Sequence, residues 1–351
     1  MTNKFRLSRR IWHIASLLTS STNTNYLRTR GGSLDSIKIL YAYWFKYGSP
    51  VSMGVFRAVM GALTFINFLM ISVYYSDWFS ETGYVPAWLN SFTISKDVML
   101  NSSGTLRIPR IDVLHGVTDY RVMVAFNVFV LFVALCTCLG LFTRISSICL
   151  AIGVITFHHR NSSILHGGDT VLRISAIYMA IAPSGAAFSL DRFIAVRRGL
   201  APAIPPLVSM WPQRLIAYNT CLIYFTSTWS KWFGGLWKTG AATWYPARLH
   251  EFDRFPVPGF INEFPMVYLT TYGTLGVEFA LATLVWFKSL RKWVLLSGLM
   301  LHGFIDYSMN IPLFGYLMAT LYLSFYEGEE VVGWYERMKA RWKKESVPEA
   351  A

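Results

Sequence analysis

The sequence predicts an all-α, polytopic integral membrane protein, a bundle of about eight transmembrane helices. Hydrophobic residues make up 54% of the 351-residue chain and charged residues only 15%, whereas soluble domains carry about 25% charge. Apolar stretches recur with short gaps between them, which predicts one membrane domain. We expect a basic N-terminal segment at 1–50, the transmembrane domain at 51–326 and a basic tail at 327–351.

Eight apolar segments account for the predicted spans. A helix needs about 20 predominantly apolar residues to cross a bilayer. We expect the spans at about 51–75, 120–141, 145–157, 170–188, 213–233, 266–287, 293–305 and 312–326. The third and the seventh of these are short, so the number of spans is the least secure part of the prediction.

The distribution of Lys and Arg predicts the orientation. These residues concentrate in the N-terminal segment, around 192–214, around 288–292 and in the tail. Cytoplasmic loops carry the excess of positive charge, so both termini should be cytoplasmic in a multi-pass protein of the cytoplasmic membrane, with the lipid bilayer as its partner. The net charge of +13 is explained in this way, and the chain has no separate basic domain that would predict nucleic-acid binding.

This orientation gathers three polar stretches at the outer face. They are HHRNSSILHGGD at 158–169, the loop that follows Lys231, and LHGFIDYSMN at 301–310. Polar side chains at membrane depth are costly, so their accumulation at one end of a helical bundle is typical of a site between helices. We therefore expect one shared cavity there.

Lys231 is the first candidate in this cavity. It is the only cation in an apolar, aromatic run and lies close in sequence to Trp229, Trp232 and Trp237. Two roles are open. An amine among apolar groups loses hydration, which favours its neutral form and lets it act as a base. Alternatively, the lysine extends its ammonium group to the membrane interface as an anchor.

The turn before the fourth span is the second candidate. Gly167 and Gly168 allow a sharp turn, and Asp169 is expected to cap the helix that follows. Arg160 and His166 belong to the same stretch. The histidines there are not accompanied by a set of carboxylates, so we predict no metal.

Other ionisable residues lie in or near the spans. His302 and Asp306 are four residues apart and share a helical face, either as a structural hydrogen-bonded pair or as groups that orient or protonate a substrate. Arg57, Arg173 and Glu278 need partners in a membrane, and we expect Glu278 to pair with an arginine.

The positions of the cysteines and the lack of common catalytic motifs argue against several classes of function. Cys136, Cys138, Cys149 and Cys221 lie in apolar segments without metal-ligand spacing and are expected to be inert thiols. The sequence contains no G-x-S-x-G nucleophile motif and no P-loop, so hydrolase and NTPase functions have no support.

Four stretches, taken in order, carry a resemblance to a known family. They are GVFRAVMG at 54–61, HRNSSILHGGDTVLRI at 159–174 with SLD at 189–191, IYFTSTWSKWFGGLWKTGA at 223–241 and HGFIDYSMNIPLFGY at 302–316. Their order and spacing resemble those of the horizontally transferred transmembrane (HTTM) domain superfamily of the bacterial type, whose best-studied member is vitamin K-dependent gamma-carboxylase. The resemblance covers about residues 50–326.

The resemblance implies roles for particular residues. Lys231 stands at the position of the carboxylase lysine that deprotonates reduced vitamin K, and His302 at that of a histidine near the substrate. It thus implies Lys231 and His302 as catalytic residues and a reduced isoprenoid quinone as the cofactor. Around them we expect a substrate or structural pocket formed by Arg57, Arg160, His166, Gly167, Gly168, Asp169, Trp237 and Asp306.

Three functions follow as hypotheses. A quinone-linked oxidoreductase or carboxylase-like enzyme predicts an apolar passage from the lipid to Lys231. A factor for maturation or export of a secreted peptide, as in bacterial relatives that act on a sporulation-delaying toxin, predicts a peptide or accessory-protein partner and tolerance of arginine at Lys231. A non-catalytic membrane protein predicts that Lys231, His302 and His166 lie far apart.

Overall fold

The computed structural model describes residues 33–86, 88–89, 112–252 and 254–345. Most of the predicted N-terminal segment and the end of the tail lie outside these residues. The chain divides into two compact units, 1–46 and 47–351. In the first unit, helix α2 (Ser33–Phe45) stacks Tyr41 on Phe45, with 4.8 Å between the ring centroids. The second unit contains every other element described below.

Each of the eight predicted spans is helical in the second unit. The corresponding helices are α3 (Val51–Ser72), α6 (Tyr120–Leu139), α7 (Thr143–Arg160), α8 (Gly167–Ile181), α10 (Trp211–Phe233), α12 (Phe264–Thr283), α13 (Lys288–Ser308) and α14 (Phe314–Leu321). The two segments predicted to be short form longer helices, because α7 and α13 also include the polar residues at their ends. The fold class is therefore confirmed as all-α.

The remaining elements are short connections and a terminal helix. They are β1 (Tyr47–Gly48), α4 (Tyr75–Phe79), α9 (Leu190–Arg197), β2 (Val208–Ser209), α11 (Gly235–Lys238), the 3₁₀ turns η1 (Ala242–Trp244), η2 (Pro246–Arg248), η3 (His250–Phe252), η4 (Gly259–Asn262), η5 (Leu284–Trp286) and η6 (Tyr322–Phe325), and α15 (Gly328–Glu345). Strands β1 and β2 pair antiparallel, with Tyr47 opposite Ser209.

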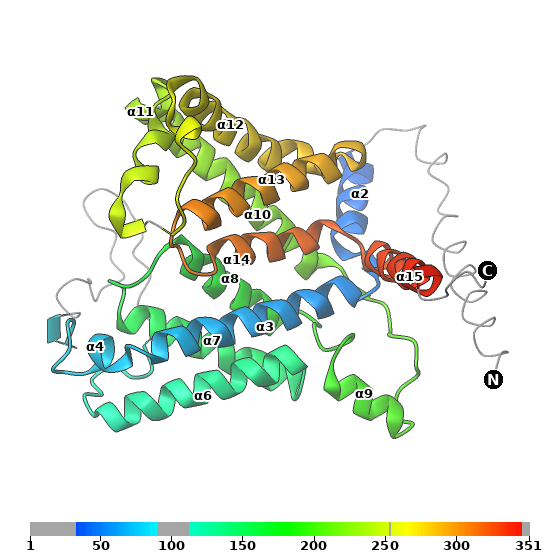
Figure 1. Ribbon diagram of the computed structural model, residues 1–351. Coiled ribbons are helices and arrows are strands. Elements are labelled where there is room, and N and C mark those ends of the chain that lie inside the picture. Colours follow the sequence, from blue (N-terminus) through cyan, green and yellow to red (C-terminus); the bar gives the residue numbers. More distant parts are fainter. Residues whose placement is uncertain (1–32, 87, 90–111, 253, 346–351) are drawn as a thin grey trace, which may run out of the picture. The chain divides into compact units, whose positions relative to one another are not determined.

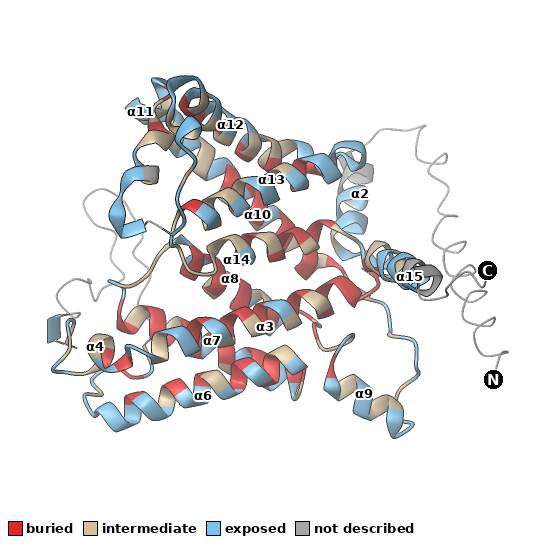
Figure 2. Ribbon diagram, viewed as in Figure 1, coloured by how far each residue is buried: buried red, intermediate tan, exposed pale blue. Residues whose placement is uncertain are grey.

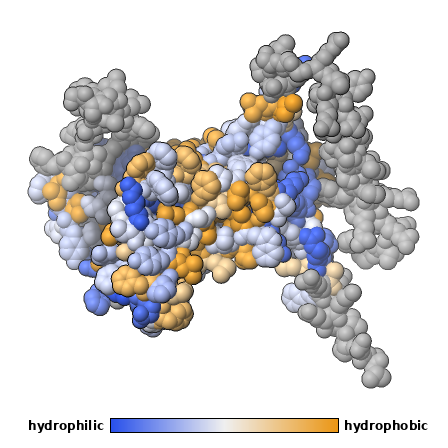
Figure 3. Space-filling model, turned by 90° about the horizontal axis from the view of Figure 1, so that it is seen from above, coloured by the Kyte–Doolittle hydropathy of each residue, from blue (hydrophilic) through white to orange (hydrophobic). Residues whose placement is uncertain are grey.

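Two of the described helices, α3 and α6, are long and apolar enough to cross a membrane by length and composition alone. Helix α6 exposes Val128, Phe129, Phe132 and Leu135. A helix that is apolar on all sides, yet lies at the edge of a bundle, needs an apolar solvent. Seen from the α12 side, hydrophobic side chains also extend across the middle of the second unit's surface (Figure 3).

The helices of the second unit pack in two groups joined by α14. Helix α6 packs on α3 and α7, and α7 packs on α8, whereas α10 packs on α12, and α12 packs on α13. Helix α14 contacts α3, α8, α10 and α13, so the buried residues concentrate around it (Figures 1 and 2). Connections alternate between the two ends of the bundle: α4 and α11 lie at one end, and α9 and α15 at the other (Figure 1).

Arg57 lies toward the end that carries α9, where it fastens the α6–α7 turn. Its side chain is fully buried and donates to the carbonyl of Phe188 at 2.5 Å. Asp191 accepts from the backbone N–H groups of Phe142 and Thr143 at 2.8 and 2.7 Å. The predicted place of Arg57 in the outer pocket is therefore wrong, because its guanidinium group holds the opposite end of the bundle together.

Gly140 is required by this arrangement. Its φ of +69° is strained for other residues, and a Cβ atom there would meet the Arg57 guanidinium and the Ser189 side chain. Gly199 has a similar φ of +72° but open space around it. A substitution at Gly199 therefore causes backbone strain alone, whereas the same substitution at Gly140 causes both backbone strain and crowding.

We expect Gly140→Ala to destabilise the protein more than Gly199→Ala does. Both substitutions impose backbone strain, and the crowding against Arg57 adds about 1–3 kcal/mol at Gly140. Thermal unfolding in detergent, followed by intrinsic fluorescence, measures the difference. Equal melting temperatures for the two variants would show that the Arg57 contact does not constrain this turn.

Candidate functional site

Lys231 and Glu278 form an ion pair between two helices. Lys231 lies in the last turn of α10, which ends at Phe233, and Glu278 lies in α12. The Lys231 Nζ atom also donates to the Ser227 hydroxyl, one turn earlier, at 2.6 Å. The Glu278 side chain is 10% exposed and that of Lys231 24% exposed. The expectation that Glu278 pairs with an arginine is wrong. Helix α10 packs on α12 and places Lys231 next to Glu278, so the lysine is its partner.

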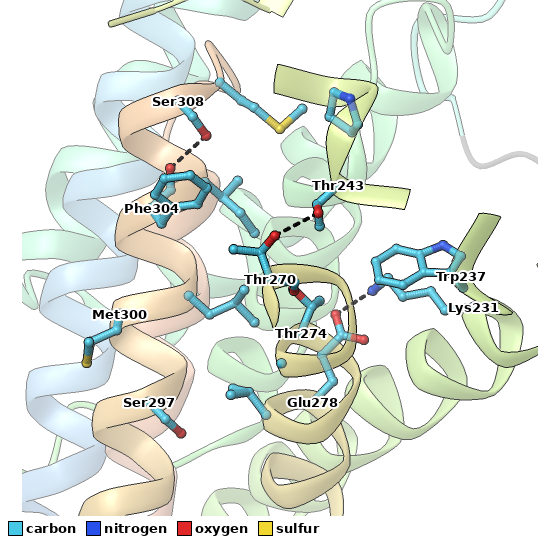
Figure 4. A pocket seen from close by; sticks show the side chains of 16 residues that line it. Lys231, Trp237, Thr243, Thr270, Thr274, Glu278, Ser297, Met300, Phe304 and Ser308 are labelled. Atoms are coloured by element: carbon cyan, nitrogen blue, oxygen red, sulfur yellow. Dashed lines mark hydrogen bonds and ion pairs between the residues drawn. The ribbon is translucent and has the colours of Figure 1, made fainter. Parts of the chain in front are cut away.

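The pair lies in the wall of a cavity of about 450 Å³ (Figure 4). Helices α12 and α13 supply most of the lining, and the Trp237 ring from α11 lies over the ammonium group at 5.3 Å. Lys231 and Glu278 are the only charged residues among those that line it. An acid–base pair in a mainly apolar cavity is the arrangement in which ionisable groups act most strongly on a ligand.

The polar groups of this cavity differ in how well they are satisfied. Thr274 and Ser308 donate to carbonyl groups of their own helices, Thr270 and Phe304, at 2.7 and 2.8 Å. The Glu278 Oε1 atom accepts from Lys231, but the buried Oε2 atom has no hydrogen-bond partner. A buried carboxylate oxygen without a donor is costly, so this atom is the natural point for a ligand hydroxyl.

The cavity also reaches the outside of the bundle. Met300 of α13 lines it and is 69% exposed. Phe304 and Ile305 follow along the same helix and are half-buried. Apolar side chains therefore lead from the surface of α13 toward Lys231, which is the passage expected for a lipid-soluble ligand.

His302 lies behind this cavity and does not line it. Its Nε2 atom lies 2.7 Å from the hydroxyl of Tyr224, which in turn lies 2.7 Å from the hydroxyl of Tyr322. The His302 side chain is buried and its ring packs against Phe314. Its direct neighbours are thus the Tyr224 phenol and the Phe314 ring, and Tyr322 extends the chain of hydrogen bonds beyond Tyr224.

Asp306 binds a different partner from His302. Its carboxylate pairs with the Arg254 guanidinium at 2.9 Å, and the same guanidinium donates to the Asp306 carbonyl at 2.9 Å. The two residues share a helical face, as predicted, but the structure shows no hydrogen bond between them. The hypothesis of a His302–Asp306 pair is therefore wrong, because a loop cation reaches Asp306 instead.

The turn before α8 forms a reciprocal cap. His166 is the N-cap residue, and its Nδ1 atom accepts from the Gly168 N–H at 3.0 Å. The Asp169 carboxylate accepts from the His166 N–H at 2.8 Å. Asp169 does stabilise the helix start as predicted, but from the third helical position, so the N-cap residue itself was assigned incorrectly. Gly167 and Gly168 form the first turn of α8, and a Cβ atom on Gly168 would collide with the His166 ring.

His166 and Asp169 line a second cavity, of about 1060 Å³, which shares no lining residue with the first. His302 and Asp306 line neither cavity. Arg160 also lines neither; it is buried and donates to the carbonyls of Leu114 and Val117. The predicted single cavity is therefore wrong: Lys231 and Trp237 belong to one cavity, and the residues of the HGGD turn to another.

Several residues of these cavities escaped the sequence analysis. Glu278 was noticed only as a charge in an apolar helix, although that costly position is itself a signal for a functional pair. Ser227 lies four residues before Lys231, so helical spacing would have found it. Tyr224 and Tyr322 meet only through tertiary packing, and no local pattern in the sequence indicates it.

Comparison with known protein families gives one match that covers most of the chain. The family model described as the HTTM domain matches residues 45–329. The match includes both cavities, the Lys231–Glu278 pair and the Arg57 site. Neither a comparison with curated proteins nor one with solved structures gave a match.

The ion pair predicts a specific pattern of stabilities. Lys231→Met and Glu278→Leu should each destabilise the protein, because each leaves a largely buried charge without its partner, whereas the double variant should lose less than the sum, with a coupling of about 1–3 kcal/mol. Melting temperatures of the four proteins in detergent test this. Lys238→Met, at an exposed lysine in α11, should leave the melting temperature unchanged. Strictly additive losses would mean that the pair does not link the helices.

Proposed function

The chain belongs to the HTTM domain family, the membrane proteins related to the carboxylase, and from this premise we propose that it is a quinone-linked membrane enzyme in which Lys231 acts as a base. One observation carries the proposal. The Lys231–Glu278 pair, with one unsatisfied carboxylate oxygen, lies in an apolar cavity that opens at the outer surface of α13.

The proposed cofactor, a reduced isoprenoid quinone, fits the donors and acceptors of this cavity. A quinol hydroxyl would donate to the Glu278 Oε2 atom, which has no other donor. The apolar side chains of α12 and α13, among them Val277, Met300 and Phe304, suit the ring and an isoprenoid chain. When bound, the quinol supplies the reducing equivalents, and the protein supplies the proton acceptor.

Lys231 becomes a base through its partner. In the ion pair the Lys231 amine is already protonated, so it cannot accept a second proton from the quinol. In a cavity with little water, the free energies of a charged and a neutral pair come close together, because desolvation penalises both charges. Movement of one proton from the ammonium group to Glu278 leaves a neutral amine, which then accepts a proton from the quinol hydroxyl. The Ser227 hydroxyl accepts from the Lys231 ammonium group at 2.6 Å and donates to the Glu278 Oε1 atom at 3.3 Å, so it holds both side chains in place.

We expect Lys231→Met to abolish the oxidation of quinol by dissolved dioxygen, the electron acceptor of the assay, with the purified protein in lipid nanodiscs and the quinone product measured by absorbance. Lys231→Arg should also be inactive, because a guanidinium group stays protonated. Glu278→Gln should lower the rate by about 100-fold, the effect typical of a residue in acid–base catalysis. Lys238→Met is the control and should retain full activity.

The activity of Lys231→Arg distinguishes the two hypotheses that give Lys231 a role, the quinone-linked enzyme and the peptide maturation or export factor. Loss of activity together with a folded protein supports the base. Full activity of Lys231→Arg would refute it and would favour the maturation or export of a peptide, for which only a positive charge is needed.

We also propose that the helices at the eight predicted spans cross the cytoplasmic membrane, the short α14 together with η6, and that both termini are cytoplasmic. The alternation of the connections in Figure 1 supports this, since consecutive helices run in opposite directions. Arg192, Arg197 and Arg198 of the α9 region lie at the end predicted to be cytoplasmic. The HGGD turn and the loop after Lys231 lie at the other end.

Cysteine labelling in intact cells tests this orientation. A cysteine introduced at Gly259, an exposed position in η4, should react with a membrane-impermeant maleimide, whereas one introduced at Arg198 should react only after the membrane is permeabilised. The parent protein is the control, because its four cysteines all lie within helices. The reverse pattern of labelling would invert the proposed topology.

A further inference from the structure

The second cavity takes no part in the proposed chemistry at Lys231. It lies among α3, α4, α7 and the start of α8, and it is completed by η3 and by the connection between α13 and α14. Its volume of about 1060 Å³ is more than twice that of the first cavity. The cavity is open to the outside, since exposed residues such as Tyr74 and Glu251 form part of its lining, so a ligand could enter it.

One buried side chain in its wall has no hydrogen bond. His158 is 1% exposed, and neither of its ring nitrogens forms a hydrogen bond. Asn67 is 8% exposed, and its side chain lies close enough to Asp169 to act on that carboxylate. Both residues line the cavity. Unsatisfied polar groups at a cavity wall are costly in the empty protein, and a ligand that binds them removes the cost.

The charge of the wall is negative. Among the lining residues, the charged ones are Asp169, which is 5% exposed, and Glu251, which is exposed. Asp169 has no Lys or Arg within ion-pair distance in the described part of the chain. Its nearest basic neighbours are His166, at 3.6 Å, and His158, at 3.7 Å. Arg173, one turn later in α8, acts on this carboxylate only from beyond ion-pair distance, so the cavity holds a buried carboxylate without a cation in direct contact.

The hydrogen bonds show that His166 does not supply the missing charge. Its Nδ1 atom accepts from the Gly168 N–H, so this nitrogen carries no proton and the ring is neutral. The same cap occupies N–H groups at the start of α8, so the helix start offers little to an anion. A positive ligand suits Asp169 better than a negative one.

Aromatic rings complete the site. Four aromatic residues line the cavity, from the α3–α4 connection, α4, α7 and η3: Tyr74, Trp78, Phe157 and Phe252. Aromatic faces attract organic cations, and cages of such rings with a carboxylate bind ammonium groups in many proteins. A metal ion is a poorer match, because the described residues contain no group of three His, Cys, Asp or Glu side chains placed to hold one.

We propose that this second cavity binds an organic ammonium group attached to an apolar body. The ammonium group pairs with Asp169, the unpartnered His158 nitrogen accepts one of its N–H bonds, and the aromatic rings enclose the apolar part. Glu251, at an exposed position, adds a second negative charge that attracts the cation. The site acts independently of the Lys231–Glu278 pair.

Phenethylamine and 2-phenylethanol form a matched pair of probes, because they share the ring and differ in the ammonium group. We expect phenethylamine to bind the full-length protein in detergent, measured by isothermal titration calorimetry, and 2-phenylethanol to bind at least about tenfold more weakly, as expected when an ion pair is lost. Equal affinities for the two probes would overturn the proposal, because the site would then recognise only an apolar ring.

Two variants assign the binding to this cavity. Asp169→Asn keeps an oxygen that can accept from the His166 N–H, so the helix cap survives, and it should weaken phenethylamine by about tenfold or more. Glu251→Lys changes an exposed residue, so the fold should be retained, and the new positive charge should weaken the binding of phenethylamine by repulsion. Glu278→Gln, in the other cavity, should leave its affinity unchanged. Loss of binding in Glu278→Gln alone, with Asp169→Asn unaffected, would place the amine in the first cavity and refute the proposal.

A further comparison identifies the natural source of the ammonium group. In nanodiscs of phosphatidylcholine, addition of phosphatidylethanolamine should displace phenethylamine if a lipid headgroup occupies the site. Unchanged binding of phenethylamine in those nanodiscs would instead support a free amine. Failure of phenethylamine to bind in any of these preparations would refute the proposal, whatever the activity at Lys231.

Discussion

The contact between Lys231 and Glu278 determines how the second half of the bundle can be built. Each charge alone would be expensive in a membrane helix, so α10 and α12 must pack in the register that brings the two together. The pair therefore fixes the position of α12, and α12 in turn supplies one wall of the cavity. The ion pair that joins the two helices also supplies the charged groups among the described residues that line the cavity.

At the other end of the bundle, buried charges also need partners, but there the partners are groups of the main chain. Arg57 is fully buried, but its guanidinium donates to a backbone carbonyl. The Asp191 carboxylate accepts from backbone N–H groups of the α6–α7 turn. These charges have their strongest bonds with the main chain and line neither of the two cavities discussed here. Arg57 and Glu278 each keep buried atoms without a hydrogen-bond partner, two nitrogens in the first and one oxygen in the second. They differ because Lys231 and Glu278 line a cavity that a ligand could enter.

Local patterns in the sequence were enough to predict the helices and insufficient to predict their partners. Apolar runs separated by Gly, Pro and basic residues located all eight long helices, since helix formation depends on neighbouring residues. The position of Lys231 at the end of its helix followed from the same pattern. Its pairing with Glu278 did not, because 47 residues separate them in the chain. The cluster of His302 with Tyr224 was missed for the same reason, as it depends on how α10 and α13 pack.

The error about a single cavity has a physical explanation that bears on function. Membrane topology places residues at one end of a bundle, but it does not say which helices lie between them. Here α14 lies between the two groups and contacts α3, α8, α10 and α13. Its neighbour in sequence, η6, supplies Tyr322, which bonds to Tyr224 and so links to His302. The helix that separates the cavities is thus also next to the chain of hydrogen bonds behind the first one. Helix α14 therefore packs on helices that line each cavity, α3 and α8 for the second and α13 for the first, which is why residues at one end of the bundle are divided between two sites.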